Sequence, residues 1–269
     1  MIYINKSGDA FQLFVPCPQK GFPTMMTNFL FENFRLKKDQ IFEGLTSKEL
    51  DSLMGSGVTH AYKKGEIIFR EGGIPTGIFY VKTGRVKKYK VTVKGGEQIF
   101  YVCGEGELLG YHALLGEEYY PDSAATIEDS EITFIPKENF LLVLRNSTVL
   151  SNSLLKALGH EFSLFINSIT NLATKTVRER LAFNLLILEE KFKTAGKPDE
   201  SSEINMSRTD LANMVGTAKE TLVRLLHDFK RDKLIESNGR IIRITDRKGI
   251  IKEANLMGQS VKKTALKNS

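Results

Sequence analysis

The middle of the chain, from Val58 to about Phe134, alternates short apolar runs with glycine-rich turns. These runs are rich in β-branched and aromatic residues, which is typical of β-strands. Several short strands with regular turn signals predict an antiparallel sandwich or barrel. The clearest predicted strands are residues 67–69, 78–81, 86–93, 98–102 and 132–135.

Helical patterns flank this β-rich region. Apolar residues recur at helical spacing over residues 26–56 and again over 137–145. Thr46 and Glu49 have the spacing of a capping box, which predicts a helix start at Thr46. Residues 1–25 show no clear period and are expected to form a flexible N-terminal extension. The candidate start residues are Met1, Met25 and Met26.

A long helix is predicted from Ser151 to Thr174. Its apolar positions are separated alternately by three and four residues, the heptad pattern of a coiled-coil seam. This narrow stripe favours a dimer interface with a second copy of the chain. The alternative is an amphipathic helix that packs the same stripe on its own domain. The stripe consists of Leu155, Leu158, Phe162, Phe165, Ile169 and Leu172.

Residues 207–226 have the pattern of two short helices joined by a tight turn. Ser207 can cap the first helix and Thr217 the second, with Glu220 as the capping-box partner of Thr217. Gly216 can adopt the positive φ that such a turn often requires. This layout predicts a helix-turn-helix, whose second helix enters the major groove of DNA.

A β-hairpin is predicted directly after these helices. The runs 234–237 and 240–244 flank Asn238-Gly239, a residue pair that strongly favours a two-residue hairpin turn. A helix-turn-helix followed by a hairpin is a winged helix. Arg240 and Arg243 on the hairpin are candidates for phosphate contacts, and a merely solvated hairpin is the alternative.

The exposed N-terminal face of the second helix is predicted to carry the base-reading residues Lys219, Glu220 and Arg224. Arginine can donate two hydrogen bonds to guanine, and glutamate can accept one from cytosine. Glu220 has a structural alternative, as the capping partner of Thr217 or in an ion pair with Arg224 one turn away. Residues better placed for phosphates, which position a protein on DNA, are Arg208, Thr209, Thr217, Lys219 and Thr221.

The composition excludes several other classes of protein. The 269 residues carry a net charge of +6, which mildly favours a polyanionic partner. Cys17 and Cys103 are the only cysteines, too few for a disulfide framework or a cysteine-ligated metal cluster. The four histidines are scattered, and phosphate-loop and nucleophile-elbow motifs are absent, so we expect no enzyme, no metal and no cofactor. No apolar run approaches the roughly 20 residues of a membrane span, and we expect a cytoplasmic protein with no membrane partner.

A β-rich domain, a long helix and a winged helix, in this order, resemble the CRP/FNR family of bacterial transcription regulators over residues 29–250. The segments that carry the resemblance are KGEIIFREG at 64–72, GIFYVKTGRVK at 77–87, GELLG at 106–110 and NLATKTVRERL at 171–181. The resemblance implies a β-roll sensor joined to a winged helix. It also implies that a Glu-x-x-x-Arg pair such as Glu220 and Arg224 reads a G·C pair within a TGA-like half-site.

The resemblance further implies an effector pocket within a short cassette. Members that bind cyclic AMP have a glutamate soon after the second cassette glycine and an Arg-Ser pair near the cassette end. Here Tyr111 follows Gly110, and Asp122, before Ser123, stands in the arginine position when one residue is inserted. An acid in place of arginine repels a phosphate, so we predict no binding of cyclic AMP in the usual way. The cassette candidates are Gly106, Glu107, Leu108, Gly110, Tyr111, His112, Asp122, Ser123 and Ala124.

The effector itself stays open at this level. Phe165 and Ile166 are apolar where the resemblance implies contact with a nucleotide base. A different small ligand, or none, is expected, and haem held by His112 is a further alternative.

The predicted fold class is α+β, with an antiparallel β-roll of the cyclic-nucleotide-binding type, a long dimerisation helix and a winged helix-turn-helix. The expected function is a homodimeric transcription regulator that binds a palindromic site in double-stranded DNA, with RNA polymerase as a further candidate partner. The alternative is a ligand-binding module that acts through protein interactions. The expected divisions are 1–25 extension, 26–150 β-roll sensor, 151–174 dimerisation helix, 175–250 DNA-binding domain and 251–269 basic disordered tail.

Overall fold

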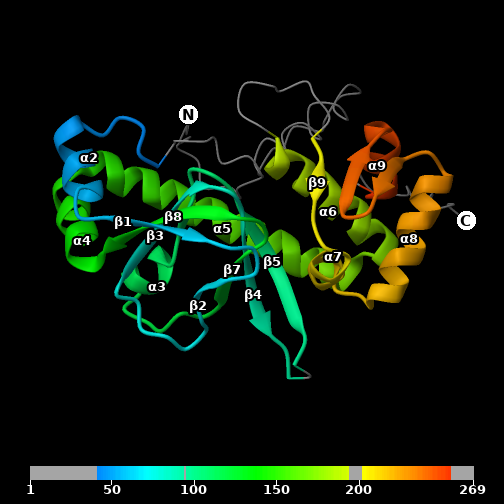
Figure 1. The fold of residues 1–269 in the computed structure, drawn as a ribbon, viewed down its shortest axis with the longest axis horizontal. Coiled ribbons are helices and arrows are strands. Elements are labelled where there is room, and N and C mark those ends of the chain that lie inside the picture. The colour runs from blue at the N-terminus through cyan, green and yellow to red at the C-terminus, as the bar shows by residue number, and fades with distance from the viewer. Residues whose placement is uncertain (1–40, 94, 194–201, 256–269) are drawn as a thin grey trace, which may run out of the picture.

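The computed structural model describes residues 41–93, 95–193 and 202–255. The predicted extension 1–25, residues 26–40 of the first helical pattern and residues 256–269 of the predicted tail lie outside these residues. Two four-stranded antiparallel sheets form the N-terminal β-roll, with strand orders β1-β8-β3-β6 and β2-β7-β4-β5 (Figure 1). Their strands are β1 (Val58–Tyr62), β2 (Ile67–Phe69), β3 (Gly77–Thr83), β4 (Val86–Val91), β5 (Glu97–Cys103), β6 (Leu108–Leu109), β7 (Ser123–Thr126) and β8 (Ser130–Pro136).

Alternating side chains of these strands fill the core between the two sheets. Ile78, Val86 and Ile132 are fully buried. The turn between β3 and β4 needs Gly84, because its φ is +88° and a Cβ there would lie 2.2 Å from Ser130 Oγ. The five runs predicted as strands are therefore confirmed, although β4 ends at Val91, before the predicted end of that run.

Among residues 41–150, three short helices pack beside the two sheets. They are α2 (Ser47–Met54), α3 (Tyr111–Leu115) and α4 (Lys137–Asn146). The capping box at the start of α2 is confirmed, since Glu49 N donates to Thr46 Oγ1 and Thr46 N donates to the Glu49 carboxylate.

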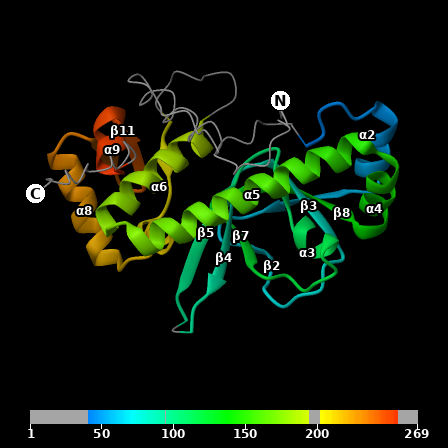
Figure 2. The same cartoon turned by 180° about the vertical axis from the view of Figure 1, so that it is seen from behind.

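The long helix α5 (Thr148–Thr174) crosses the β-roll and reaches the C-terminal domain (Figure 2). It starts before the predicted Ser151, because the Ser147 hydroxyl accepts a hydrogen bond from Leu150 N and so caps the helix earlier.

Helix α5 carries two apolar stripes rather than one. The stripe that packs on its own domain comprises the buried residues Leu150, Leu154, Ala157 and Leu164. The predicted seam is a different stripe, and Leu158 is its only partly buried member. The exposed members are Leu155 (66%), Phe162 (65%), Phe165 (54%), Ile169 (51%) and Leu172 (45%). The alternative that this stripe packs on its own domain is therefore wrong for these five positions.

The C-terminal domain is a winged helix with a small three-stranded sheet of order β10-β11-β9. The predicted hairpin is present, but its two-residue turn is Gly239-Arg240 and not Asn238-Gly239, because Asn238 belongs to β10 and pairs with Ile241. Gly239 has a φ of +55°. The last helix runs past residue 250, where the tail was expected to begin, and Ala254 is fully buried. The elements are α6 (Val177–Phe192), β9 (Ile204–Asn205), α7 (Arg208–Val215), α8 (Lys219–Arg231), β10 (Ile235–Asn238), β11 (Ile241–Ile244) and α9 (Arg247–Glu253).

Candidate DNA-binding surface and effector groove

Helices α7 and α8 and the turn between them form the predicted helix-turn-helix. The predicted cap of α7 is present, since Asp210 N donates to Ser207 Oγ over 2.9 Å. Gly216 ends the helix with a φ of +71°, as the turn requires. Arg180 from α6 donates to the carbonyl oxygens of Val215 (2.8 Å) and Gly216 (3.0 Å), so the turn is held by the neighbouring helix.

The predicted cap of α8 is wrong. Both Gly216 N and Thr217 N donate to the Ala212 carbonyl, so Thr217 still belongs to the turn that ends α7. Ala218 occupies the N-cap position and makes no side-chain cap hydrogen bond. The third helical position is consequently Thr221, and Glu220 is not placed to complete a capping box.

The three base-reading candidates all lie in the first two turns of α8. Lys219, Glu220 and Arg224 are exposed, and Val223 between them is 48% exposed. Within the part of the chain that the structure describes, the side chains of Glu220 and Arg224 make no hydrogen bond and no ion pair. The face is therefore available to a partner, and neither structural alternative for Glu220 applies here.

The candidates for phosphate contacts differ in their exposure and in the hydrogen bonds and ion pairs that they already make. Thr209 is exposed, while Thr217 in the turn and Thr221 on α8 are half-buried. Arg208 is half-buried and donates to the Arg240 carbonyl over 3.4 Å, which ties α7 to the tip of the wing. On the wing itself, Arg243 pairs with Glu203 at 2.5 Å, whereas the Arg240 side chain is exposed. Arg240 is thus better placed than Arg243 to meet a phosphate.

An open groove of about 1050 Å³ lies between α5 and the sheet that contains β4 and β5. Its long walls are apolar and include Phe100, Leu155, Phe162 and Phe165. Polar side chains gather at one end, where Lys88, His112, Asp122 and Glu161 come together from β4, α3, the segment before β7, and α5. The seam residues therefore form one edge of the groove.

Only two of the nine cassette candidates line this groove, namely His112 and Asp122. Gly106 and Gly110 shape the cassette backbone with φ values of +85° and +78°. Tyr111 is 1% exposed, and its burial and the nearby Glu161 carboxylate raise the pKa of its hydroxyl. The remaining candidates, which are buried elsewhere in the β-roll, are Glu107, Leu108, Ser123 and Ala124.

Two of the charged side chains at the polar end of the groove are almost completely buried. Lys88 Nζ lies 3.4 Å from Asp122 Oδ2, and the two side chains are only 7% and 4% exposed. Burial raises the pKa of the Asp122 carboxyl, although Lys88 opposes the shift. Burial also lowers the pKa of His112 to about 4, so this imidazole is neutral at physiological pH. The 3.8 Å contact between His112 Nε2 and Asp122 is therefore not an ion pair under those conditions.

Lys88 and Glu161 are groove residues that no local pattern in the sequence marks. Lys88 and Lys90 alternate along the strand, a pattern that is typical of a solvent-exposed strand face, yet Lys88 is only 6% exposed. Burial would lower the pKa of Lys88, but the neighbouring carboxylates of Glu161 and Asp122 raise it overall. Lys88 is thus a buried cation with acidic neighbours.

Glu107 has a different role from the one expected of a cassette residue. Its carboxylate accepts hydrogen bonds from the Tyr101 hydroxyl (2.7 Å), the Lys191 ammonium (2.6 Å) and Gly104 N (3.0 Å). Lys191 belongs to α6, so this nearly buried ion pair joins the DNA-binding domain to the β-roll. Tyr101 also lines the groove and thereby connects the groove wall to that joint.

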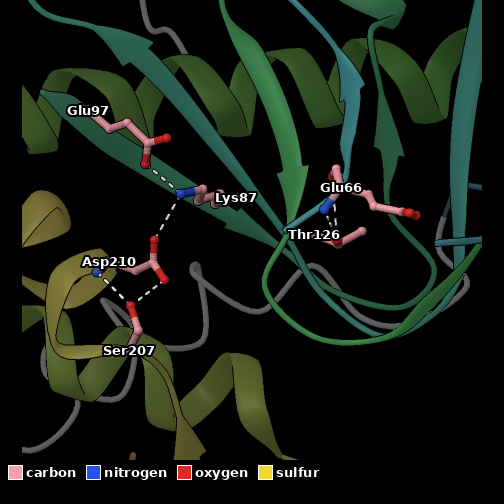
Figure 3. Close-up of polar contacts among 6 residues, drawn as sticks. All are labelled: Glu66, Lys87, Glu97, Thr126, Ser207 and Asp210. Carbon is pink, nitrogen blue, oxygen red and sulfur yellow. Dashed lines mark hydrogen bonds and ion pairs between the residues drawn. The ribbon is translucent and has the colours of Figure 1, made fainter. Parts of the chain in front are cut away.

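A second ion pair connects the two domains at the helix-turn-helix (Figure 3). Lys87 of β4 donates to Glu97 on β5 (2.5 Å) and to Asp210 on α7 (2.8 Å). Burial alone would lower the pKa of Lys87, but its hydrogen bonds to the two carboxylates raise it. Figure 3 also shows that Asp210 reaches Ser207, the cap of α7.

The described residues offer neither a clustered metal site nor a membrane span. No group of three or more histidine, cysteine, aspartate or glutamate side chains could hold a metal ion in residues 41–93, 95–193 and 202–255. No helix within those ranges is long and apolar enough to cross a membrane.

Comparisons with known proteins agree with this architecture. Residues 59–147 match the cyclic nucleotide-binding domain, and residues 179–252 match the Crp-like helix-turn-helix domain. The transcriptional activator protein anr of Pseudomonas aeruginosa is 30% identical over 184 residues, which cover 68% of this chain and 75% of that protein.

Solved structures share the fold. FixK2 from Bradyrhizobium japonicum has a TM-score of 0.64 and 22% identity, covering 73% of this chain and 96% of its own. A CRP/FNR family transcriptional regulator from Thermus thermophilus has a TM-score of 0.57 and 24% identity, covering 75% of this chain and 100% of its own. With a sensor domain of the cyclic-nucleotide-binding type followed by a Crp-like helix-turn-helix, the chain belongs to the CRP/FNR family of transcription regulators.

Proposed function

We propose that this transcription regulator acts as a homodimer on a palindromic site in double-stranded DNA. The observation that carries the proposal is the exposed stripe on α5, from Leu155 to Leu172, beside a separate stripe that already packs on the β-roll. Exposed large apolar residues at heptad spacing lose their contact with water when a second α5 covers them. Two-fold pairing along α5 would place two copies of α8 about 34 Å apart, one turn of DNA.

Base reading is proposed for Glu220 and Arg224, with Lys219 beside them. Their exposure and their lack of partners within the described residues support this role. Arg224 would donate to a guanine and Glu220 would accept from the paired cytosine. Thr209, Thr217, Thr221, Arg208 and Arg240 would contact phosphates and fix the position of α8 in the groove.

The effector is proposed to be something other than cyclic AMP. Tyr111 fills the position after Gly110 and is buried, and Asp122 stands at the polar end of the groove. A cyclic phosphate there would meet a carboxylate in place of the arginine fork that holds it in members that bind cyclic AMP. Isothermal titration with cyclic AMP should show no binding at micromolar concentrations, and clear binding in that range would refute this part.

Selection of DNA from a random pool by the purified full-length protein tests the main proposal. We expect the retained sequences to share a palindrome with TGA-like half-sites, and analytical ultracentrifugation to show a dimer on that DNA. Retention of a single half-site by a monomer would overturn the dimer proposal. RNA polymerase is proposed as a further partner, and its recruitment can be tested by transcription from a promoter that carries the selected site.

If the protein shows no salt-dependent binding to any DNA in the pool, a module that acts through protein contacts replaces this proposal.

A further inference from the structure

The polar end of the groove contains an unused hydrogen-bond acceptor. Asp122 is 3% exposed, and its Oδ2 faces Lys88. Its other oxygen, Oδ1, is buried without a hydrogen-bond partner among the described residues. His112 Nε2 lies 3.8 Å from this oxygen, which is beyond hydrogen-bond length. Buried carboxylate oxygens are normally satisfied, so this one points to a donor that comes from outside the protomer.

The charges around this acceptor determine which donor fits. Lys88 is the only buried cation that lines the groove in the described chain, and two carboxylates, Asp122 and Glu161, surround it. Lys90, at the rim, already pairs with Glu71 at 3.0 Å. Neither cation that lines the groove in the described chain is therefore left unpaired to balance an anionic ligand, whereas a neutral or positively charged donor would gain a partner.

The remainder of the groove is suited to the apolar part of a ligand. Phe100, Phe162 and Phe165 form walls next to the polar end, and most of the groove surface is apolar. Gly159 of α5 also faces the groove, and a Cβ at this position would have nothing within 4 Å. An aromatic ring between these walls would place a short head group towards Asp122.

We propose that this groove binds a small aromatic or aliphatic molecule whose head is a cationic or neutral N–H or O–H donor to Asp122 Oδ1, and that it discriminates against anions. This inference rests on the proposed function, because it assigns a chemical class to the regulator's effector. In the proposed dimer, the partner's α5 would cover the outer edge of the groove at Phe162 and Phe165. Tyr101, which lines the groove and hydrogen-bonds Lys191, then connects the ligand to the DNA-binding domain.

Three probes with the same phenyl body test the head group. They are 2-phenylethylamine, 2-phenylethanol and 3-phenylpropanoate, titrated into the full-length protein and followed by ligand-observed NMR. We expect the amine and the alcohol to bind at least tenfold more tightly than the carboxylate. Equal or tighter binding of the carboxylate, or no binding of any probe at millimolar concentration, would overturn the inference.

Two variants localise the binding. Asp122→Asn should abolish the preference for the amine over the carboxylate, while Asp51→Asn, an exposed aspartate on α2, should leave it unchanged. Gly159→Leu keeps the helix and fills the groove, so it should weaken the amine and the alcohol at least tenfold even where Asp122→Asn does not fold. Unchanged amine binding in Gly159→Leu would place the probe elsewhere and refute the site.

The inference can fail without the proposed function. A protein that selects a palindrome as a dimer but shows no preference among the three probes retains its role as a regulator and loses only this ligand class. If the DNA selection fails but the probes bind in the expected order, the ligand class is retained and the proposed role in DNA binding is lost.

Discussion

Lys87 Nζ lies 2.8 Å from Asp210 Oδ1, and this contact joins a sensor strand to the first helix of the helix-turn-helix. The side chains are 12% and 17% exposed, so little water screens the pair. Asp210 also caps α7 together with Ser207. A change in the position of β4 therefore acts directly on the helix that supports the DNA-reading helix.

We expect the Lys87–Asp210 pair to have a measurable coupling energy. A double-mutant cycle with Lys87→Met and Asp210→Asn, read by thermal unfolding, should give a coupling of about 1–2 kcal/mol. The matched control is Lys63–Asp129, whose side chains are 78% and 65% exposed and whose coupling should be much smaller because water screens the pair. Equal coupling in both pairs would mean that the contact between domains contributes no more than a surface pair.

Replacement of Phe162 by glutamate should prevent dimer formation without unfolding the protein. Phe162 is 65% exposed in the protomer, so the change removes no contact from the protomer core and places a charge in the seam. Loss of a central aromatic anchor should raise the dimer dissociation constant by about 30-fold or more, or about 2 kcal/mol. Sedimentation measures this change, and Asn167→Glu, off the stripe, is the control. An unchanged dimer in Phe162→Glu would exclude this seam.

Arg224→Ala and Lys219→Ala should have different effects on DNA binding. Loss of Arg224 should reduce discrimination at one G·C position by about 1–3 kcal/mol, because a bidentate contact to guanine is lost. Loss of Lys219 should weaken binding more evenly on cognate and scrambled DNA. Competition titrations on both DNAs distinguish the two effects, and equal losses for Arg224→Ala would remove its base-reading role.

Gly216→Ala should destabilise the DNA-binding domain by two separate effects. The positive φ costs about 1–2 kcal/mol for an L-residue, and the new Cβ would lie 3.2 Å from Leu172 Cδ2. Gly239→Ala is the matched control, because Gly239 has a φ of +55° and nothing within 4 Å of the added atom. Thermal unfolding should show the larger loss of stability for Gly216→Ala. Equal losses would show that Leu172 moves aside without cost.

Features that depend on neighbours in the chain could be predicted from the sequence. The caps at Thr46 and Ser207, the turn at Gly216 and the presence of the hairpin all depend on residues within a few positions, although the hairpin turn lies at Gly239-Arg240, one residue later than predicted. The cap at Thr217 could not be placed correctly, because the end of α7 continues through this residue and shifts the start of α8 by one.

Contacts between distant segments could not be predicted in this way. Lys87 and Asp210 are 123 positions apart, and Lys191 and Glu107 are 84 apart, so no local pattern links either pair. The cassette segment was located correctly, yet only His112 and Asp122 of its candidates face the groove. Consecutive residues, Glu107 with Leu108 and Ser123 with Ala124, are all buried in the β-roll away from the groove, so their burial depends on how the cassette packs in three dimensions and not on a local period.

The two stripes of α5 separate the folding of the protomer from its pairing. Leu150, Leu154, Ala157 and Leu164 anchor the helix on its own domain, so a single chain keeps its core when it is alone. Pairing through the other stripe is then an equilibrium between folded molecules. At concentrations below the dimer dissociation constant, the amount of dimer rises with the square of the protein concentration. Occupancy of a palindromic site would therefore respond more steeply than in proportion to the cellular level of the protein, which would give the regulator a sensitivity to its own abundance in addition to any effector.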